Sequence, residues 1–432
     1  MTIQNLYHLY LKYPLICTDT RKASEGSLFF ALKGESFDGN LFAAKAIEFG
    51  AEYAVIDDPA YQVSDKYILV PDVLTCLQEL ATYHRKQLKI PFIGITGSNG
   101  KTTTKELLNA VLSQKYKTHA TLGNLNNHIG VPLTVLRIDE DVEIAIIEMG
   151  ANHKEEITFL CSISQPDYGL ITNVGKAHLE GFGGFEGVKQ GKGELYDYLK
   201  STGGTAFVNH GNPSLCEMVD GRKLSKVVYY GNGPKSTLKA DIIENNPFLS
   251  IRWKWNNIDH QVKSYLTGTY NFENILAAIT VGLHFGLSAE EINWGIESYL
   301  PGNNRSQITK TSTNTLICDY YNANPSSMMV ALENFGAMDA DKKVLILGGM
   351  FELGEESERE HLEVLKKAEA IAGTDRIYIG NDFFHIRTGF SGKFFKTTAE
   401  AAEYLNLNPI TSSAVLIKGS RGIKLEQLLN YL

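Results

Sequence analysis

Residues 94–107, GITGSNGKTTTKEL, carry the pattern that decides how the surrounding chain folds. An apolar segment, Ile90–Ile95, stands ahead of it, and Thr102–Leu112 behind it combines helix formers with apolar residues at helical spacing. We therefore predict a strand, a glycine loop and a helix, in that order. Gly97 and Gly100 permit a tight loop with inward-pointing backbone N–H groups, and the following helix adds the positive end of its dipole. Such a loop suits a phosphate group.

Two side chains that follow the loop extend this prediction. Lys101 would reach the outer phosphates, and the Thr102 hydroxyl suits Mg²⁺ because a hard cation prefers oxygen ligands. The general phosphate-loop pattern has a further glycine where Ile95 stands, so this loop is the shorter GxxGKT form. Strand, loop and helix together predict a nucleoside triphosphate site. The residues expected to contact the nucleotide here are Gly97, Ser98, Asn99, Gly100, Lys101, Thr102 and Thr103.

Composition and charge narrow the class of protein. The chain has 432 residues, enough for about three domains. Hydrophobic residues at 43% and charged residues at 21% are typical of a globular protein, and the net charge of −8 argues against bulk nucleic-acid binding. The N-terminus lacks a signal-peptide pattern and no long apolar run follows, so we expect a cytoplasmic protein without membrane insertion. The five scattered cysteines make disulfides and a zinc site unexpected.

Residues 1–88 have the pattern of a small α/β unit. Short strands at Ser27–Leu32 and Tyr53–Ile56 flank a helical stretch at Leu41–Phe49. Polar loop residues near strand ends often contact ligands, although solvated loops would have the same composition. The residues concerned are Thr20, Arg21, Lys33 and Asp38.

Residues 89–306 alternate strand and helix patterns, which predicts a largely parallel sheet covered by helices. Ligands of such sheets gather at the carboxyl ends of the strands. Three strands end in polar residues: at the phosphate loop, at Glu148, and at Thr172–Asn173. A stretch rich in Trp, Ile and Val, 238–266, predicts an antiparallel insertion. The other expected elements are strands Ile90–Thr96, Ile144–Met149 and Gly169–Asn173 and helices 101–113, Lys154–Cys161, Val188–Leu199, Asn271–Phe285 and Ala289–Tyr299.

Residues 307–432 predict a third α/β domain. Strands are expected at Thr315–Asp319, Val344–Leu347, Ile377–Ile379 and Ala414–Ile417, with helical segments between them. The absence of a GxGxxG motif argues against a dinucleotide cofactor. Two turns could bind an anionic or amide-rich ligand or be simple turns: DYYNANPSSM, 319–328, and IKGSRG, 417–422, ahead of the last helix.

Three side chains of the central segment could carry chemistry. Glu148 closes an apolar strand, where a buried carboxylate needs a cation or a donor; a capping or salt-bridged acid is the alternative. His178 follows a strand end in a glycine-rich loop and could be a metal ligand or a surface histidine. Lys192 lies on a predicted helix, and a carbamate formed from it could bind a metal, although a plain exposed lysine fits the same pattern.

The chain resembles the Mur ligases over nearly its full length. The motifs that carry the resemblance are TDTRK, LKGESFDG, TGSNGKTTTKE, TLGNLNNHIGVPLT, EMGANHKEEI, ITNVGKAHLEGFGG, GKGEL, YNFENILAA, DYYNANPSSM, LGGMFELGEES and IKGSRG. The resemblance implies a UDP-substrate domain at 1–88, an ATP-binding domain at 89–306 and a Rossmann-like domain at 307–432. It further implies ATP and Mg²⁺ as cofactors, and we expect a monomer.

The implied activity is the joining of D-alanyl-D-alanine to UDP-N-acetylmuramoyl-tripeptide through an acyl phosphate, in cell-wall synthesis. The implied substrate contacts are Thr20, Arg21, Lys33, Asp38, Asn126, Asn127, Asn322 and Asn324. The implied nucleotide contacts outside the loop are Asn274, Arg305 and Asp319. The implied catalytic residues are Lys101, Glu148, His178 and Lys192, and the implied magnesium ligands are Thr102, Glu148, His178 and carbamylated Lys192.

The sequence also departs from the family pattern. Thr20 stands where serine is usual, Gly349 where aspartate is common, and His128 where an acid or amide is frequent. The rival interpretations are the sister ligase that adds a diamino acid, folylpolyglutamate synthetase, and a nucleotide-dependent switch that ligates nothing. The Asn-Ala-Asn-Pro turn and the absence of a DNPR segment argue against the sister ligase, and the first domain argues against folylpolyglutamate synthetase.

Overall fold

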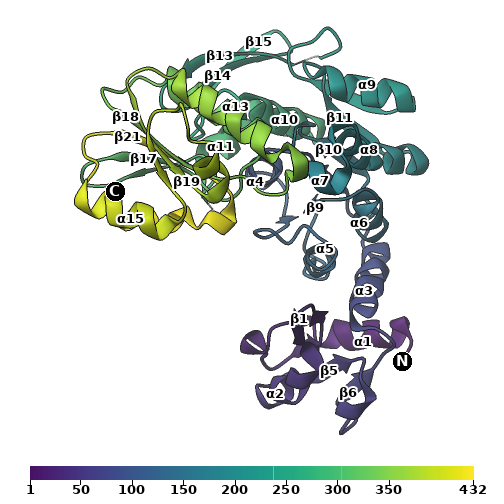
Figure 1. The fold of residues 1–432 in the computed structure, drawn as a ribbon. Helices are drawn as coiled ribbons and strands as arrows, with labels where there is room; N and C mark the ends of the chain where they lie inside the picture. The colour runs from purple at the N-terminus through teal and green to yellow at the C-terminus, as the bar shows by residue number, and fades with distance from the viewer. Residues whose placement is uncertain (237, 303) are drawn as a thin grey trace.

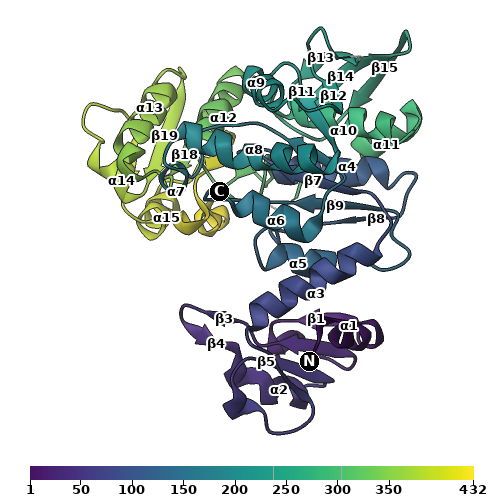
Figure 2. The same ribbon diagram turned by 90° about the vertical axis from the view of Figure 1, so that its right-hand side faces the viewer.

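The chain folds into three parts, each built on a sheet whose strands are wholly or mostly parallel. The computed structural model describes residues 1–236, 238–302 and 304–432. The N-terminal part runs to helix α3 (Val73–Gln87), the central part from β7 (Phe92–Thr96) to α11 (Ala289–Ser298), and the C-terminal part from β16 (Gln307–Lys310) onward. Figures 1 and 2 show the N-terminal part standing away from the other two, with α3 between them. This is the α/β class expected.

The N-terminal part is a four-stranded parallel sheet with helices and short 3₁₀ turns. Before α3 its elements are α1 (Ile3–Lys12), β1 (Leu15–Cys17), η1 (Thr20–Lys22), β2 (Ser27–Phe30), β3 (Lys33–Gly34), β4 (Phe37–Asp38), η2 (Gly39–Phe42), α2 (Ala43–Glu48), β5 (Tyr53–Ile56), η3 (Pro59–Tyr61) and β6 (Tyr67–Leu69). The sheet order is β1-β2-β5-β6. Every residue of β2 is buried, as in a strand covered on both faces.

The central part holds a six-stranded sheet in the order β12-β11-β10-β7-β9-β8, with all neighbours parallel. Its elements after β7 are α4 (Lys101–Leu112), β8 (Thr118–Ala120), α5 (Gly130–Val135), β9 (Ile144–Glu148), α6 (Glu156–Ser164), β10 (Tyr168–Ile171), α7 (Leu179–Phe182), α8 (Phe185–Thr202), β11 (Thr205–Asn209), α9 (Pro213–Arg222) and β12 (Val227–Tyr230). Strand β7 lies between β9 and β10. The phosphate loop is therefore flanked by Glu148, the last residue of β9, and by Thr172–Asn173, which follow β10.

The stretch at 238–266 forms the antiparallel insertion that its composition predicts. It consists of β13 (Lys239–Asn245), β14 (Leu249–Trp255) and β15 (Ile258–Lys263), and Trp253 of β14 is fully buried. Helices α10 (Asn271–His284) and α11 follow and pack against α4. These helices cover the phosphate-loop helix and bring Asn274 beside the loop.

The C-terminal part is a six-stranded sheet in the order β16-β17-β21-β18-β19-β20, in which only the described pair β16–β17 is antiparallel. Its elements after β16 are β17 (Thr315–Asp319), α12 (Pro325–Ala337), β18 (Lys343–Gly348), η4 (Gly354–Glu356), α13 (Ser357–Glu369), β19 (Thr374–Ile379), α14 (Asn381–His385), β20 (Lys393–Phe395), α15 (Thr398–Leu407), β21 (Ala414–Lys418), η5 (Arg421–Ile423) and η6 (Leu425–Tyr431). Asp319 and Lys418 close neighbouring strands. The segment after IKGSRG is a 3₁₀ turn rather than the α-helix expected.

Within the described residues, no helix is both long and apolar enough to cross a membrane. The divisions at 88/89 and 306/307 fall between elements and stay predictions.

Candidate functional site

The phosphate loop takes a conformation that requires glycine at two positions. Gly97 has φ +143° and Gly100 has φ +79°, both in the region that favours glycine. A Cβ atom on Gly97 would lie 3.1 Å from the Thr172 nitrogen, and one on Gly100 would lie 2.8 Å from Asn274 Oδ1. The loop is thus packed closely on both sides.

Residues that follow β10 hold the loop from one side. Ser98 N donates to the Asn173 carbonyl at 3.0 Å, and Asn99 N donates to Asn173 Oδ1 at 3.0 Å. In return, Thr172 Oγ1 donates to the Asn99 carbonyl at 2.6 Å. The N–H groups of the first turn of α4 have no intrahelical partner, because no turn precedes them. These N–H groups are therefore available to donate hydrogen bonds to a phosphate group.

Lys101 folds back over the loop. Its Nζ donates to the Gly97 carbonyl at 2.6 Å, and its side chain lines the cavity described below. Burial lowers the pKa of Lys101 to about 8, against its usual 10.5, while the Glu148 carboxylate acts in the opposite direction. When a nucleotide binds, the Lys101 ammonium could donate to phosphate oxygens in place of the backbone carbonyls of the loop.

Glu148 is a buried carboxylate with only one oxygen engaged. The residue ends β9 and is 1% exposed, and its Oε1 accepts a hydrogen bond from Asn126 Nδ2 at 2.7 Å. Its Oε2 is buried and has no hydrogen-bond partner among the described residues. A buried carboxylate oxygen without a donor is costly unless a cation meets it. Glu148 and the buried hydroxyl of Thr102 are the oxygen donors that a Mg²⁺ ion prefers.

His178 and Lys192, the other two expected metal ligands, have different surroundings. The His178 ring lines the cavity and contacts the carboxylate of Glu352 in the C-terminal part, and this hydrogen bond lowers the pKa of Glu352. Lys192 is buried in α8, and its Nζ donates to the Ala151 carbonyl at 2.9 Å. Burial moves the pKa of Lys192 well below its usual value. In the part of the chain that the structure describes, no three His, Cys, Asp or Glu side chains gather as metal ligands.

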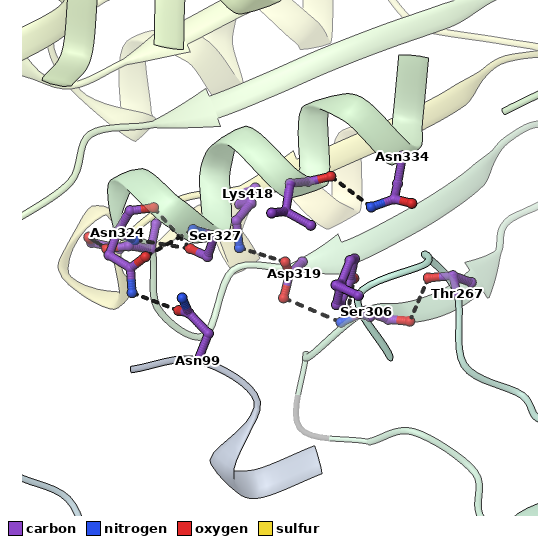
Figure 3. Close-up of polar contacts among 12 residues, drawn as sticks. Asn99, Thr267, Ser306, Asp319, Asn324, Ser327, Asn334 and Lys418 are labelled. Atoms are coloured by element: carbon purple, nitrogen blue, oxygen red, sulfur yellow. Dashed lines mark hydrogen bonds and ion pairs between the residues drawn. The ribbon is translucent and has the colours of Figure 1, made fainter. Parts of the chain in front are cut away.

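Three expected nucleotide contacts line the same cavity. Asn274 Oδ1 accepts from Thr104 Oγ1 at 3.0 Å, and the Arg305 guanidinium lies 3.9 Å from the centre of the Tyr321 ring. Asp319 pairs with Lys418 Nζ at 2.5 Å and accepts from the Ser306 nitrogen at 3.3 Å, as Figure 3 shows.

The Asn-Ala-Asn-Pro turn separates its two asparagines. Asn322 lines the cavity. Asn324 also borders it, but Oδ1 of Asn324 caps α12 by accepting from Ser327 N at 2.9 Å, and its Nδ2 donates to Asn99 Oδ1 at 2.8 Å (Figure 3). The structure therefore leaves the amide of Asn322 the freer of the two to meet a peptide ligand.

The expected UDP-substrate contacts lie on the N-terminal part, outside this cavity. Arg21, the residue after Thr20, pairs with Asp19 at 2.7 Å, and Lys33 pairs with Asp57 at 2.8 Å. Asp38 caps η2 by accepting from Asn40 N at 2.9 Å. The structure therefore does not bring these residues together with the phosphate loop.

One cavity joins the remaining candidates except Gly97 and Lys192, which are not among the residues that line it. It has a volume of about 1210 Å³ and is lined by the phosphate loop, by Glu148 and the residues after it, by 269–274 and by the turn after β17. Among the described residues, none of those lining it belongs to 1–88. Asn126 and Asn127 also line it, and Asn127 Oδ1 additionally accepts from the backbone nitrogen of Gly130, the first residue of α5, at 2.8 Å. Phosphate loop, carboxylate and the C-terminal part thus face one space large enough for a nucleotide and a small acceptor.

Comparison with known proteins gives the family. Residues 12–85 match the model of the Mur ligase family, catalytic domain, residues 95–282 the Mur ligase middle domain, and residues 304–421 the Mur ligase, glutamate ligase domain. UDP-N-acetylmuramoyl-tripeptide--D-alanyl-D-alanine ligase of Bacillus subtilis (strain 168) is 34% identical, over 96% of this chain and 92% of that protein. The chain belongs to the Mur ligase family.

Solved structures of Mur ligases have the same fold. MurF from Acinetobacter baumannii is 31% identical, with a TM-score of 0.89 over 99% of this chain and 98% of that chain. The MurF ligase from Thermotoga maritima in complex with ADP is 26% identical, with a TM-score of 0.85 over 98% and 97% of the two chains.

Two of the departures of this Mur ligase from its family pattern, Gly349 and His128, lie in different surroundings. Gly349 follows β18, and a Cβ atom added there would lie 3.5 Å from Asp382 Oδ2. His128 is exposed, and its carbonyl accepts from Gln78 Nε2 of α3 at 2.9 Å. Nothing around either residue explains the departure.

Three residues enter the site that the sequence did not single out as contacts. Asn173 holds the loop, Lys418 pairs with Asp319, and Glu352 meets His178. Asn173 and Lys418 stand at the carboxyl ends of predicted strands, which was the available signal. Glu352 lies within the LGGMFELGEES motif, but nothing in that motif indicates a contact with His178, because the two residues are distant in the sequence.

Proposed function

We propose that this Mur ligase joins D-alanyl-D-alanine to UDP-N-acetylmuramoyl-tripeptide, with conversion of ATP to ADP and phosphate, in the synthesis of bacterial peptidoglycan precursors. The observation that carries the proposal is the single cavity in which the phosphate loop and the turn at Asn322 face each other. Its Bacillus subtilis relative carries this activity in its name.

The reaction needs positioning more than covalent help from the protein. The terminal carboxylate of the tripeptide takes the γ-phosphoryl group of ATP, which gives an acyl phosphate and ADP. The amine of D-alanyl-D-alanine then attacks the acyl carbon and loses a proton, and phosphate leaves as the amide forms. Lys101 and the N-terminus of α4 stabilise charge on the transferring group, and the cavity walls align the reactants.

Mg²⁺ would be held by the free oxygen of Glu148 and the hydroxyl of Thr102, and it would neutralise phosphate charge when bound. We retain His178 and Lys192 as further candidate ligands. The lowered pKa of Lys192 favours the neutral amine, which adds carbon dioxide and releases a proton to give a carbamate. His178 would first have to leave Glu352.

The substrates would approach from three surfaces. Thr20, Arg21, Lys33 and Asp38 would hold the UDP end, and Asn126 and Asn127 would face the peptide. Asn274, Arg305 and Asp319 would contact the nucleotide, and Asn322 the dipeptide. The division into domains 1–88, 89–306 and 307–432, a monomeric state and a cytoplasmic location belong to the same proposal.

Product analysis with defined acceptors tests the function. The enzyme receives ATP and a UDP-linked tripeptide or dipeptide, together with D-alanyl-D-alanine, D-alanine or a diamino acid, and both ADP and amide product are followed. We expect efficient amide formation only from the tripeptide and D-alanyl-D-alanine. Efficient use of the diamino acid with the UDP-linked dipeptide would assign the sister activity. Slow ADP release that ignores the acceptor would instead indicate a nucleotide-dependent switch.

A further inference from the structure

Helix α12 of the C-terminal part begins directly over the phosphate loop. The helix has 13 residues and follows its N-cap Asn324, whose Oδ1 accepts from Ser327 N while Ser327 Oγ accepts from Asn324 N. The remaining amide group of Asn324 points away from the helix and donates to Asn99 Oδ1 at 2.8 Å (Figure 3). One side chain therefore caps a helix in one part and contacts the loop of another.

Asn99 of the phosphate loop forms hydrogen bonds with both the central and the C-terminal part. Its backbone N–H and carbonyl are held by Asn173 and Thr172 of the central part, whereas its side chain is held by Asn324. The next residue is Gly100, whose left-handed conformation sets the direction of the first turn of α4. A restraint on the Asn99 side chain therefore acts one residue from the N–H groups that would meet a phosphate.

Two other contacts fix where α12 lies on the central part. Lys176 N donates to Ser326 Oγ at 2.9 Å, and at the far end of the helix Asn334 Oδ1 accepts from Thr269 N at 2.9 Å. Ten residues of helix separate Asn324 from Asn334, a distance of about 15 Å. Contacts at both ends set the position and the direction of the helix, so the Asn324–Asn99 hydrogen bond depends on docking of the whole C-terminal part.

We propose that Asn324 is a positioning residue that completes the phosphate loop from the C-terminal part. The loop has its full set of restraints only while α12 is docked, so docking strengthens the hold on the nucleotide phosphates. The inference rests on the proposed function, because it takes the loop to bind ATP, and it deepens that function by linking domain docking to nucleotide affinity. It also replaces the dipeptide contact that the sequence suggested for Asn324.

The substitution Asn324→Ser isolates the proposed role. A serine hydroxyl is a good N-cap and can still accept from Ser327 N, but it has no amide to reach Asn99. Asn212→Ser is the matched control, because Asn212 also precedes a proline and caps a helix, α9, which does not line the cavity. We expect Asn324→Ser to weaken ADP binding about five- to tenfold, the effect of one hydrogen bond. Asn212→Ser should leave ADP binding unchanged.

Calorimetric titration with ADP, which needs no acceptor, is the measurement. Asn99→Ala should weaken ADP binding to a similar degree. The double variant Asn99→Ala with Asn324→Ser should bind ADP no more weakly than the single variant with the lower affinity. In turnover, the KM for ATP should rise while the KM for D-alanyl-D-alanine stays within about twofold.

Three results would overturn the inference without affecting the proposed ligase activity. They are unchanged ADP binding in Asn324→Ser, a loss of ADP affinity in the double variant equal to the product of the two single losses, and a rise in the KM for D-alanyl-D-alanine alone. If the native enzyme forms amide product and the variants give any of these three results, the proposed function holds and the role of Asn324 does not. A native enzyme that neither binds ADP nor forms amide would remove the proposed function, and the inference with it.

Discussion

Asn126 Nδ2 donates a hydrogen bond to Glu148 Oε1 at 2.7 Å, which joins the loop after β8 to the carboxylate that closes β9. The bond orients the carboxylate and leaves its second oxygen buried without a partner among the residues described. Asn126, which we propose faces the peptide, and the candidate metal ligand Glu148 are thus joined by a hydrogen bond, so a substitution at either should affect the other.

We expect Glu148→Gln to raise the Mg²⁺ concentration for half-maximal turnover at least tenfold, because the amide lacks the charge that draws a cation. The glutamine oxygen can still accept from Asn126, and a buried charge is removed, so the thermal midpoint should stay level or rise. Magnesium titrations of turnover and thermal unfolding check this. Glu140→Gln, at an exposed acid, is the control; equal magnesium dependence in both variants would contradict the assignment.

Lys101→Ala should lower turnover by roughly a hundredfold or more, as deletion of one transition-state donor does. The side chain contacts loop carbonyls rather than a core, so the variant should fold. Steady-state rates, with circular dichroism as the folding check, test this. Near-native turnover in a folded variant would show that the loop assignment is wrong.

The pKa of Lys101 predicts a pH dependence of ATP use. Burial lowers the pKa of Lys101 to about 8 in the ligand-free enzyme, so the ammonium form dominates below that pH and is lost above it. We expect kcat/KM for ATP to be level below pH 8 and to fall as pH rises through this value. The fall in kcat should come at higher pH, because bound phosphates favour the charged lysine. A kcat/KM that stays level to pH 10 would contradict this.

Lys192→Ala should lose most turnover if a carbamate helps to hold the metal, and a short carboxylic acid such as acetate should restore part of it. Lys200→Ala, at an exposed lysine of the same helix, should change little and should not respond to acetate. Rates with and without acetate are compared at fixed pH. Full activity in Lys192→Ala would discard the carbamate.

Substrate binding should bring the N-terminal part toward the cavity, because the expected UDP contacts lie outside it while the peptide must reach the phosphate loop. Closure would also exclude water from an acyl phosphate. Small-angle scattering should show a smaller radius of gyration with the UDP-linked tripeptide and a non-hydrolysable ATP analogue. Identical scattering curves with and without these ligands would argue against closure.

Several elements follow the sequence patterns closely. The strands at Tyr53–Ile56 and Thr315–Asp319 agree to the residue, and the insertion at 238–266 is antiparallel as predicted. The sequence patterns did not predict helix α1, whose N-cap Thr2 accepts from Asn5 N; its tyrosines are weaker helix formers than its leucines. The long helix α3 was missed as well; it packs between two parts, so its burial depends on residues far along the chain.

Residues 94–112 specify their strand, glycine loop and helix locally, because backbone freedom at Gly97 and Gly100 and helical periodicity are properties of the segment alone. The apolar run that Glu148 closes likewise predicts a buried strand. Which groups these residues meet depends instead on how the parts of the chain pack together. Asn324 reaches Asn99 across 225 positions, and Glu352 reaches His178 across 174. Such pairs depend on how two separately folded sheets dock, and no periodicity or spacing within either segment records that arrangement.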